Sequence, residues 1–281
     1  MPELPELDVM VEVLTARVLG RKIVSARAYH PGMLKTVEPS LDVLDGKAFR
    51  AVSRRAKHLI FELEEELYLV VHLMLAGRLV LSKTGTKVTK ATGCVISFVD
   101  GEDLRVIENA KTHRARVHVV RDPLDVASVA TAGIEPLSDA FTAEKLSELM
   151  DQRRQLKKLL TDQPRIAGIG TAYADEILFD AKLSPIKYGT TLEPEEIERL
   201  HGSIQRVLLH AAGQIRANVG AAALTPHIRD FVKIYKKTNQ PCPECGTKIA
   251  EIRYAQTKTY YCPSCQAEGK SIKDRRAWLT R

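Results

Sequence analysis

A proline and two glutamates at the start of the chain have the types and spacing of a covalent catalytic site. Removal of Met1 would turn the Pro2 nitrogen into a free secondary amine. The Glu3 carboxylate lies beside it, and Glu6 lies one helical turn away. Because an α-amino group titrates near pH ~8, part of this amine is neutral at pH 7 and can attack an electrophilic carbon such as a sugar C1′. The other interpretation is that these residues only begin a helix, and the six residues alone favour neither.

A helix is predicted directly after the amine. Apolar residues recur at spacings of three and four, at Leu7, Val11, Leu14 and Val18. This period predicts an amphipathic helix over residues 5–19. The positive end of its dipole would disfavour protonation of a nearby amine.

Four cysteines near the other end of the chain form two Cys-x-x-Cys pairs, which are Cys242 with Cys245 and Cys262 with Cys265. This spacing predicts one tetrahedral zinc site. Four thiolates leave no position for a catalytic water, so the zinc is expected to be structural. Two disulfides are the alternative, and a cytosolic chain favours them less.

Composition indicates a protein that remains in the cytoplasm and has no membrane partner. The 281 residues are 44% hydrophobic, without a long apolar run or a signal peptide. The net charge is +7, and residues 226–281 carry 12 basic and 5 acidic residues. This segment therefore holds the whole positive excess, which is typical of a phosphate-binding module.

The elements between these two sites fall into two classes. Short apolar runs at residues 22–28, 57–63, 67–73, 78–82, 94–99, 104–107 and 115–120 predict an antiparallel β-sandwich or barrel. Lys57 would lie at the mouth of the sheet, either to contact a phosphate or as a solvated lysine. The apolar turn at residues 72–78 is either core or a wedge for a vacated base stack.

Helical periodicity follows a turn-rich linker at residues 133–141 and continues to about residue 218. Gly168 and Gly170 permit a tight turn between helices, and the next helix is expected to start near Thr171. The amides at that helix start could bind a DNA phosphate, although an ordinary helical turn explains the glycines equally well.

The chain resembles the bacterial formamidopyrimidine-DNA glycosylase and endonuclease VIII family in four motifs that occur in the same order. They are the Pro-Glu-Leu-Pro-Glu opening, the Arg-Arg-Ala-Lys57 segment, the Gly-Ile-Gly-Thr-Ala-Tyr-Ala-Asp-Glu hairpin and the four cysteines. The resemblance implies an α+β multidomain fold. We expect a catalytic helix and antiparallel β-sandwich over residues 1–132 and a linker over 133–141. A helix-two-turn-helix domain over 142–230, a four-cysteine zinc finger over 231–267 and a basic tail over 268–281 would follow.

The resemblance also implies a repair enzyme that excises a damaged base from double-stranded DNA and then cleaves the strand as an abasic-site lyase. Pro2 would attack C1′, Glu3 would move protons, Lys57 would orient a phosphate and Glu6 would support them. The expected DNA-binding residues are Leu75, Lys111, Lys157, Gly168, Gly170, Thr171 and Lys258. A monomer that acts in the bacterial cytoplasm is implied as well.

Several positions depart from the family pattern. The family's His-Leu-Gly-Met-Ser-Gly loop has Met74 in place of its glycine and Leu75 in place of its intercalating methionine. The arginine and phenylalanine that fill the void opposite the lesion appear as Ala110 and Thr112. Thr171 and Thr257 replace a phosphate-binding asparagine and arginine, although Lys258 adjoins the latter.

These departures concern recognition more than chemistry, so oxidised pyrimidines, ring-opened purines and bulky adducts all remain candidate substrates. Two alternatives to the enzyme remain open. One is a catalytically idle protein of the same fold that binds damaged DNA. The other is a zinc-ribbon nucleic-acid adaptor in which Pro2 only starts a helix.

Overall fold

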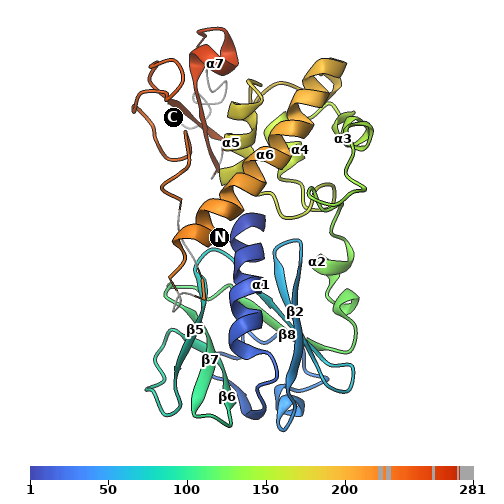
Figure 1. Ribbon diagram of the computed structural model, residues 1–281, viewed down its shortest axis with the longest axis vertical. Coiled ribbons are helices and arrows are strands. Elements are labelled where there is room, and N and C mark those ends of the chain that lie inside the picture. The colour runs from blue at the N-terminus through green and yellow to red at the C-terminus, as the bar shows by residue number, and fades with distance from the viewer. Residues whose placement is uncertain (221–223, 226–228, 255–256, 271, 273–281) are drawn as a thin grey trace. The chain divides into compact units, whose positions relative to one another are not determined.

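The computed structural model describes residues 1–220, 224–225, 229–254, 257–270 and 272 (Figure 1). The chain forms two compact units. The first consists of residues 1–132 together with 212–228, and the second of residues 133–211 together with 229–281. Of the predicted basic tail, residues 271 and 273–281 lie outside the described residues.

Helix α1 spans Leu4–Val18 and confirms the helix predicted over residues 5–19. Pro5 lies in the first turn, where a missing N–H donor has no cost. The apolar side chains Leu7, Met10 and Leu14 are buried in the core of the first unit. The spacing that predicted the helix is thus the spacing of the face that it buries.

Two four-stranded antiparallel sheets make up most of the first unit. One has the order β1-β6-β7-β5 and the other the order β2-β3-β4-β8. Their strands are β1 (Ile23–Ala28), β2 (Phe49–Arg55), β3 (His58–Leu63), β4 (Tyr68–His72), β5 (Gly77–Lys83), β6 (Thr92–Phe98), β7 (Glu102–Glu108) and β8 (Arg116–Val120). The short helices η1 (Leu41–Leu44), η2 (Pro123–Asp125) and α2 (Ala127–Ala130) lie in the connections.

The two sheets share one hydrophobic core, which identifies the fold as a sandwich. Phe49 of β2 packs against Phe61 of the same sheet, with ring centroids 5.3 Å apart. It also packs against Phe98 of the other sheet at 6.0 Å. Cys94 lies buried in this core, and burial raises the pKa of its thiol to about 12. It is therefore the inert apolar residue that its strand predicted.

Strand β2 was not among the strands predicted from the sequence. Its residues Phe49 and Val52 are buried three positions apart, because a register shift between Phe49 and Ala51 interrupts the pairing with β3. A bulge of this kind breaks the two-residue alternation on which strand prediction depends.

The second unit contains the predicted helices and the cysteine finger. Its elements are α3 (Ala143–Met150), α4 (Leu156–Leu160), α5 (Thr171–Asp180), η3 (Gly189–Thr191), α6 (Pro194–Asn218), β9 (Ala250–Tyr254), β10 (Thr257–Tyr261) and α7 (Pro263–Ala267). Helix α6 continues into the first unit from residue 212. Thr142 caps α3 by accepting the N–H of Lys145, so the helix begins where the linker was expected to end.

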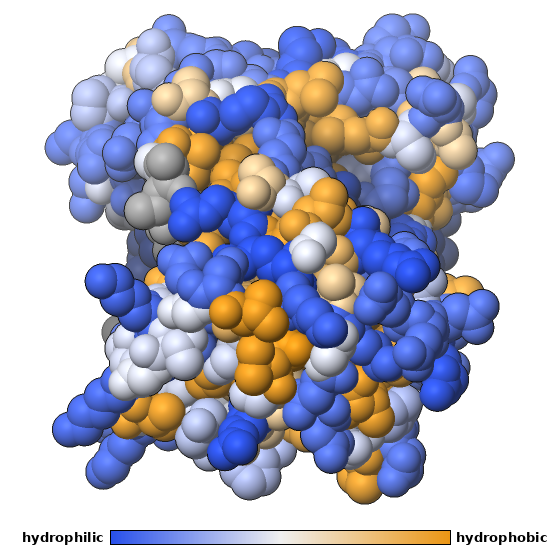
Figure 2. All heavy atoms as spheres, turned by 60° about the horizontal axis from the view of Figure 1, so that its bottom comes forward, coloured by the Kyte–Doolittle hydropathy of each residue, from blue (hydrophilic) through white to orange (hydrophobic). Residues whose placement is uncertain are grey.

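The surface is mostly polar. Charged and polar side chains cover most of the face in Figure 2, with smaller hydrophobic patches between them. Within the described part of the chain, no helix is both long enough and apolar enough to cross a membrane.

Candidate functional site

The start of α1 holds the predicted amine and both predicted carboxylates. Glu3 and Glu6 cap the helix reciprocally. The Oε2 atom of Glu6 accepts the N–H of Glu3 at 2.9 Å, and the Glu3 side chain accepts the N–H of Glu6. Both glutamates and Pro2 are buried. The helix amides thus hold two carboxylates beside the Pro2 nitrogen, which is still an amide nitrogen here because Met1 precedes it.

Lys57 lies in the two-residue turn that joins β2 to β3. Ala56, the first residue of this turn, has a positive φ of 52°. That conformation is rare without glycine, and only a small side chain fits because Ala56 is 2% exposed. Lys57 itself is 7% exposed, so it is not the solvated strand-end lysine that the sequence left open.

Arg54 links this turn to the catalytic helix. Its Nε atom donates to Oδ1 of Asp8 on α1 at 2.6 Å, and its guanidinium also donates to the carbonyl of Ala56 at 3.2 Å. The helix that begins at the amine and the turn that carries Lys57 are therefore joined through one side chain. This role of Arg54 was not predicted, because nothing in the sequence pairs residues 46 positions apart.

Two neutral histidines lie next to the Lys57 turn, His58 at the start of β3 and His72 at the end of β4. His58 and His72 pack with ring centroids 4.6 Å apart. Burial lowers the pKa of His58 to about 4. Burial, with His58 and Lys57 nearby, lowers the pKa of His72 to about 3. Both rings are thus uncharged at pH 7, and Nε2 of His58 is hydrogen-bonded to Oγ of Ser128 at 2.9 Å.

The loop of the predicted wedge connects β4 to β5. Leu75 at its tip is 63% exposed. Exposure alone identifies no wedge, because Val37 is 84% exposed on another loop. A hydrogen bond within the loop holds its conformation, since the Gly77 N–H donates to the Leu73 carbonyl at 2.9 Å. A Cβ at Gly77 would lie 2.3 Å from that oxygen, so this position requires glycine.

Lys111 lies exposed on the loop that follows β7. The buried carboxylate of Glu108 closes this loop, because its Oε2 atom accepts the N–H of Arg114 at 2.7 Å and of Ala115 at 2.9 Å. Ala110 and Thr112 are also exposed here. The loop therefore presents the cations Lys111 and Arg114 together with the small side chains Ala110 and Thr112.

The glycine turn before α5 has the predicted form. Gly168 has a φ of 82°, and its N–H donates to the side chain of Gln163 at 3.0 Å. The same side chain donates to the Ile169 carbonyl at 2.7 Å. Gly170 caps α5, which begins at Thr171 as expected. Gln163 holds the turn in place, and it was not singled out from the sequence.

Lys157 lies inside the second unit. Its Nζ atom lies 2.7 Å from Oδ1 of Asp175 and donates to the Lys258 carbonyl at 2.9 Å. The backbone N–H of Tyr260 donates to the other Asp175 oxygen at 3.2 Å. Burial raises the pKa of Asp175 to about 7, although Lys157 opposes the shift. Lys157 and Asp175 thus tie α4 and α5 to β10, the strand that carries exposed Lys258.

Glu176 anchors the segment that leads into the finger. Its buried carboxylate accepts three consecutive backbone N–H groups, from Lys233 at 2.8 Å, Ile234 at 2.9 Å and Tyr235 at 2.8 Å. Two adjacent carboxylates in the middle of a largely apolar helix were the available clue to this role and to that of Asp175.

The four cysteines come together as a metal site. Their sulfur atoms all lie within 4.8 Å of one another, with 3.9 Å from Cys242 to Cys265 and 3.4 Å from Cys245 to Cys262. A tetrahedron with Zn–S bonds of about 2.3 Å has edges of roughly 3.8 Å, so the cluster fits one zinc ion. Cys242 and Cys262 also pack in a core with Phe179 and Ile234, which makes the site structural.

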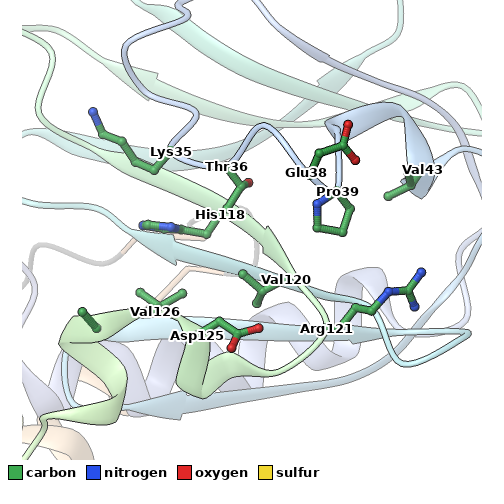
Figure 3. Close-up of a pocket in the computed structure, with 11 residues that line it drawn as sticks. Lys35, Thr36, Glu38, Pro39, Val43, His118, Val120, Arg121, Asp125 and Val126 are labelled. Carbon is green, nitrogen blue, oxygen red and sulfur yellow. The ribbon is translucent and has the colours of Figure 1, made fainter.

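A hollow of about 860 Å³ lies on the first unit, away from these residues. Figure 3 shows Glu38 and Pro39 on one side of it and Asp125 and Val126 on the other. Basic and acidic side chains are mixed in its wall, which includes Lys35 and Arg121. None of the residues that the sequence singled out lines it.

Family models match three stretches of the chain. The N-terminal domain of formamidopyrimidine-DNA glycosylase matches residues 1–114, its H2TH domain matches residues 132–219, and the zinc finger found in FPG and IleRS matches residues 239–267. The chain belongs to the formamidopyrimidine-DNA glycosylase family. The resemblance drawn from the sequence and the predicted fold class are confirmed.

Relatives in this family cover nearly the whole chain. The formamidopyrimidine-DNA glycosylase of Moorella thermoacetica is 33% identical over 260 residues, which are 90% of this chain and 95% of the relative. That of Chloroflexus aurantiacus is 34% identical over 276 residues, which are 95% and 98%.

Solved structures of the Lactococcus lactis glycosylase, Fpg, are similar throughout. Its complex with DNA containing an oxidized pyrimidine has a TM-score of 0.86 at 29% identity and covers 95% of this chain and 100% of that one. Its complex with DNA containing an abasic site has a TM-score of 0.85 at 28% identity, with 94% and 99% covered. The fold of a family of DNA glycosylases is thus present along the chain.

Proposed function

We propose that this glycosylase excises damaged bases from double-stranded DNA and then acts as an abasic-site lyase, with Pro2 as its nucleophile. The damaged nucleotide is flipped out of the helix, because C1′ is inaccessible within the stack. The nitrogen lone pair of Pro2 forms a bond to C1′, and the base leaves with the electrons of the glycosidic bond and takes up a proton. Ring opening gives an iminium ion, which acidifies the C2′ proton. Loss of that proton breaks the C3′–O bond and releases phosphate, and water then frees the amine.

One observation carries the catalytic assignment. The buried Glu3 carboxylate lies next to Pro2, and Arg54 joins this helix to the turn that bears Lys57. Glu3 is proposed to move protons to the departing base and the opened sugar, and Lys57 to orient a phosphate. Glu6 caps the helix and thereby holds Glu3 in place.

Exposure supports three of the proposed DNA contacts. Leu75, Lys111 and Lys258 are exposed and are proposed to touch DNA directly. The turn from Gly168 through Gly170 to Thr171 would present the amides of α5 to a phosphate. Lys157 is proposed to act through Lys258, whose carbonyl it holds.

Ring-opened purines and oxidised pyrimidines are the proposed substrate classes. The Lactococcus lactis relative was crystallised with DNA containing an oxidized pyrimidine and with DNA containing N7-benzyl-Fapy-dG. We also propose that the enzyme is a monomer and acts on chromosomal DNA in the bacterial cytoplasm.

Borohydride trapping tests the nucleophile. Mass spectrometry first establishes that Met1 is absent, and the protein is then mixed with a duplex containing an abasic site. The wild type should form a covalent adduct, and Pro2→Gly should lose most of it. Tight binding of the duplex without an adduct, by protein whose Pro2 is free, would favour the catalytically idle binder instead.

The two glutamates provide a matched pair for the same assay. Glu3→Gln should slow base excision about 100-fold, because it removes a proton-transfer group. Glu6→Gln should retain excision and lose about 1 kcal/mol of stability, since it weakens a cap. Equal losses of activity in both variants would contradict the separate roles assigned to them.

A further inference from the structure

Met74 has a conformation that its side chain disfavours. Its φ is 52°, in the left-handed region that glycine and asparagine tolerate and other residues avoid. Among the described non-glycine residues with positive φ, Met74 is the sole one with a large apolar side chain. The others are Ala56, Glu65, Glu66, Lys182, Lys236, Asn239 and Glu268.

The surrounding loop enforces this conformation. The Nδ1 atom of His72 accepts the N–H of Met74 at 3.1 Å, so the neutral ring fixes the Met74 backbone. Leu73 is buried on one side, and the Gly77 N–H closes the loop onto its carbonyl. Met74 is half-buried, and Leu75 beside it is exposed. The loop thus presents two adjacent large apolar side chains.

The neighbouring loop lacks such side chains. Gly77, where the first loop ends, is paired with Glu108, where β7 ends, so both loops emerge at the same end of this strand pair. The loop after Glu108 presents the small residues Ala110 and Thr112. The apolar volume available at this end therefore comes from Met74 and Leu75.

We infer that Met74 and Leu75 together form a two-residue wedge that fills the gap left by the flipped nucleotide. The inference rests on the proposed function, because a gap exists only where a nucleotide is extruded. An unbranched thioether adapts its shape to whichever base lies opposite the gap. A glycine at position 74 would remove the backbone strain and would leave part of the gap unfilled. Replacing Met74 by glycine should therefore raise the stability of the protein and lower its rate of reaction with duplex DNA.

Met74→Gly is the test. The melting temperature should rise by about 2 °C, because the strained φ suits glycine. The rate of borohydride trapping on a duplex with an abasic site should fall about tenfold, as expected when a base loses a stacking partner. Trapping on the same strand without its complement should stay within about twofold, because there is no opposite base.

Three further variants separate the wedge from a merely structural role. Met74→Asn, which suits the same φ, should behave as Met74→Gly does, and Met74→Leu should retain the duplex rate. Glu66→Gly is the matched control, since Glu66 is exposed with a φ of 55° on the β3–β4 turn. It should give a similar rise in melting temperature with an unchanged ratio of duplex to single-strand rates.

A probe that needs no chemistry distinguishes failure of the inference from failure of the proposed function. The protein is bound to a duplex with a tetrahydrofuran abasic analogue opposite 2-aminopurine, whose fluorescence reports its stacking. If the wild type traps no abasic site, the proposed lyase fails, yet a fluorescence change that Met74→Gly abolishes still supports the wedge. If the wild type traps and Met74→Gly matches it in both measurements, the wedge is overturned and the lyase stands.

Discussion

The buried carboxylates of this protein differ in what compensates for their burial. Glu108 accepts two backbone N–H groups and Glu176 accepts three. Asp175 has one backbone N–H and depends otherwise on the Lys157 ammonium. Burial outweighs these partners and raises the pKa of Asp175 to about 7, so this carboxyl titrates near neutral pH.

The raised pKa of Asp175 predicts a pH dependence of stability with a defined sign. Between its unfolded pKa near 4 and its folded pKa near 7, the folded state binds the extra proton, so rising pH destabilises the fold through this group. Asp175→Asn removes that loss. From pH 5 to pH 7 the free energy of unfolding of the wild type should therefore fall relative to the variant, by up to about 1.4 kcal/mol per pH unit. Urea denaturation at pH 5, 6, 7 and 8 measures this difference.

Asp180 provides the control, because Ser203 and Arg206 hold its pKa below the ordinary value despite partial burial. A carboxyl of this kind is ionised throughout that pH range, so Asp180→Asn should shift stability by a constant amount. If the Asp175→Asn difference is equally flat, Asp175 is ionised throughout and its pKa is not raised.

At the scale of elements, the sequence predicts what depends on local pattern. The helix at Leu4–Val18 and the four-cysteine finger follow from spacing alone. Strand β2 was missed because its bulge breaks the alternation. The link from Arg54 to Asp8 and the burial of Lys157 could not be predicted, since each depends on partners distant in sequence. The left-handed φ of Met74 could not be predicted either, because methionine disfavours this conformation.

The finger is the element whose stability depends on a metal. Cys245→Ser should lower the zinc content from about one ion per chain to nearly none, because a structural site needs all four thiolates. Loss of zinc should loosen the core that Cys242 and Cys262 share with Phe179 and weaken DNA binding. Metal analysis and fluorescence anisotropy with a labelled duplex measure the two effects.

Cys94→Ala is the matched control for this substitution. It should cost about 1 kcal/mol as a small core cavity and leave the zinc content unchanged. Full zinc content in Cys245→Ser, or oxidised cysteines without zinc in the wild type, would contradict the four-thiolate site.

At the scale of the whole molecule, charge is distributed unevenly. Residues 226–281 carry a net +7, which equals the net charge of the chain. The exposed Lys258 belongs to this segment. Long-range attraction of this kind draws a polyanion to one part of a protein before any specific contact forms.

The salt dependence of DNA binding measures the contribution of electrostatic attraction to affinity. Neutralising about four phosphates should make DNA affinity fall about 100-fold between 50 mM and 200 mM salt, because bound counterions are released. Lys258→Ala should reduce the slope of log affinity against log salt by about 1. Lys145→Ala on α3 is the control, because Lys145, like Lys258, pairs with a glutamate (2.7 Å to Glu148 and 3.3 Å to Glu251) but has no proposed DNA contact. It should leave the slope unchanged. A nearly flat response of the wild type would contradict phosphate binding.

The first unit is not made from one continuous stretch of chain, and this affects its synthesis. Thr225 is hydrogen-bonded to both backbone groups of Leu79 on the edge strand β5, at 2.9 Å and 3.2 Å, and Leu224 lies in the core. Arg216 pairs with Glu12 of α1 at 2.5 Å. A ribosome makes β5 long before these partners, and at about 5–20 residues per second the stretch from residue 132 to 228 takes roughly 5–20 s. For that interval the nascent sandwich has a sheet edge without its later cover, the kind of edge at which β-proteins aggregate.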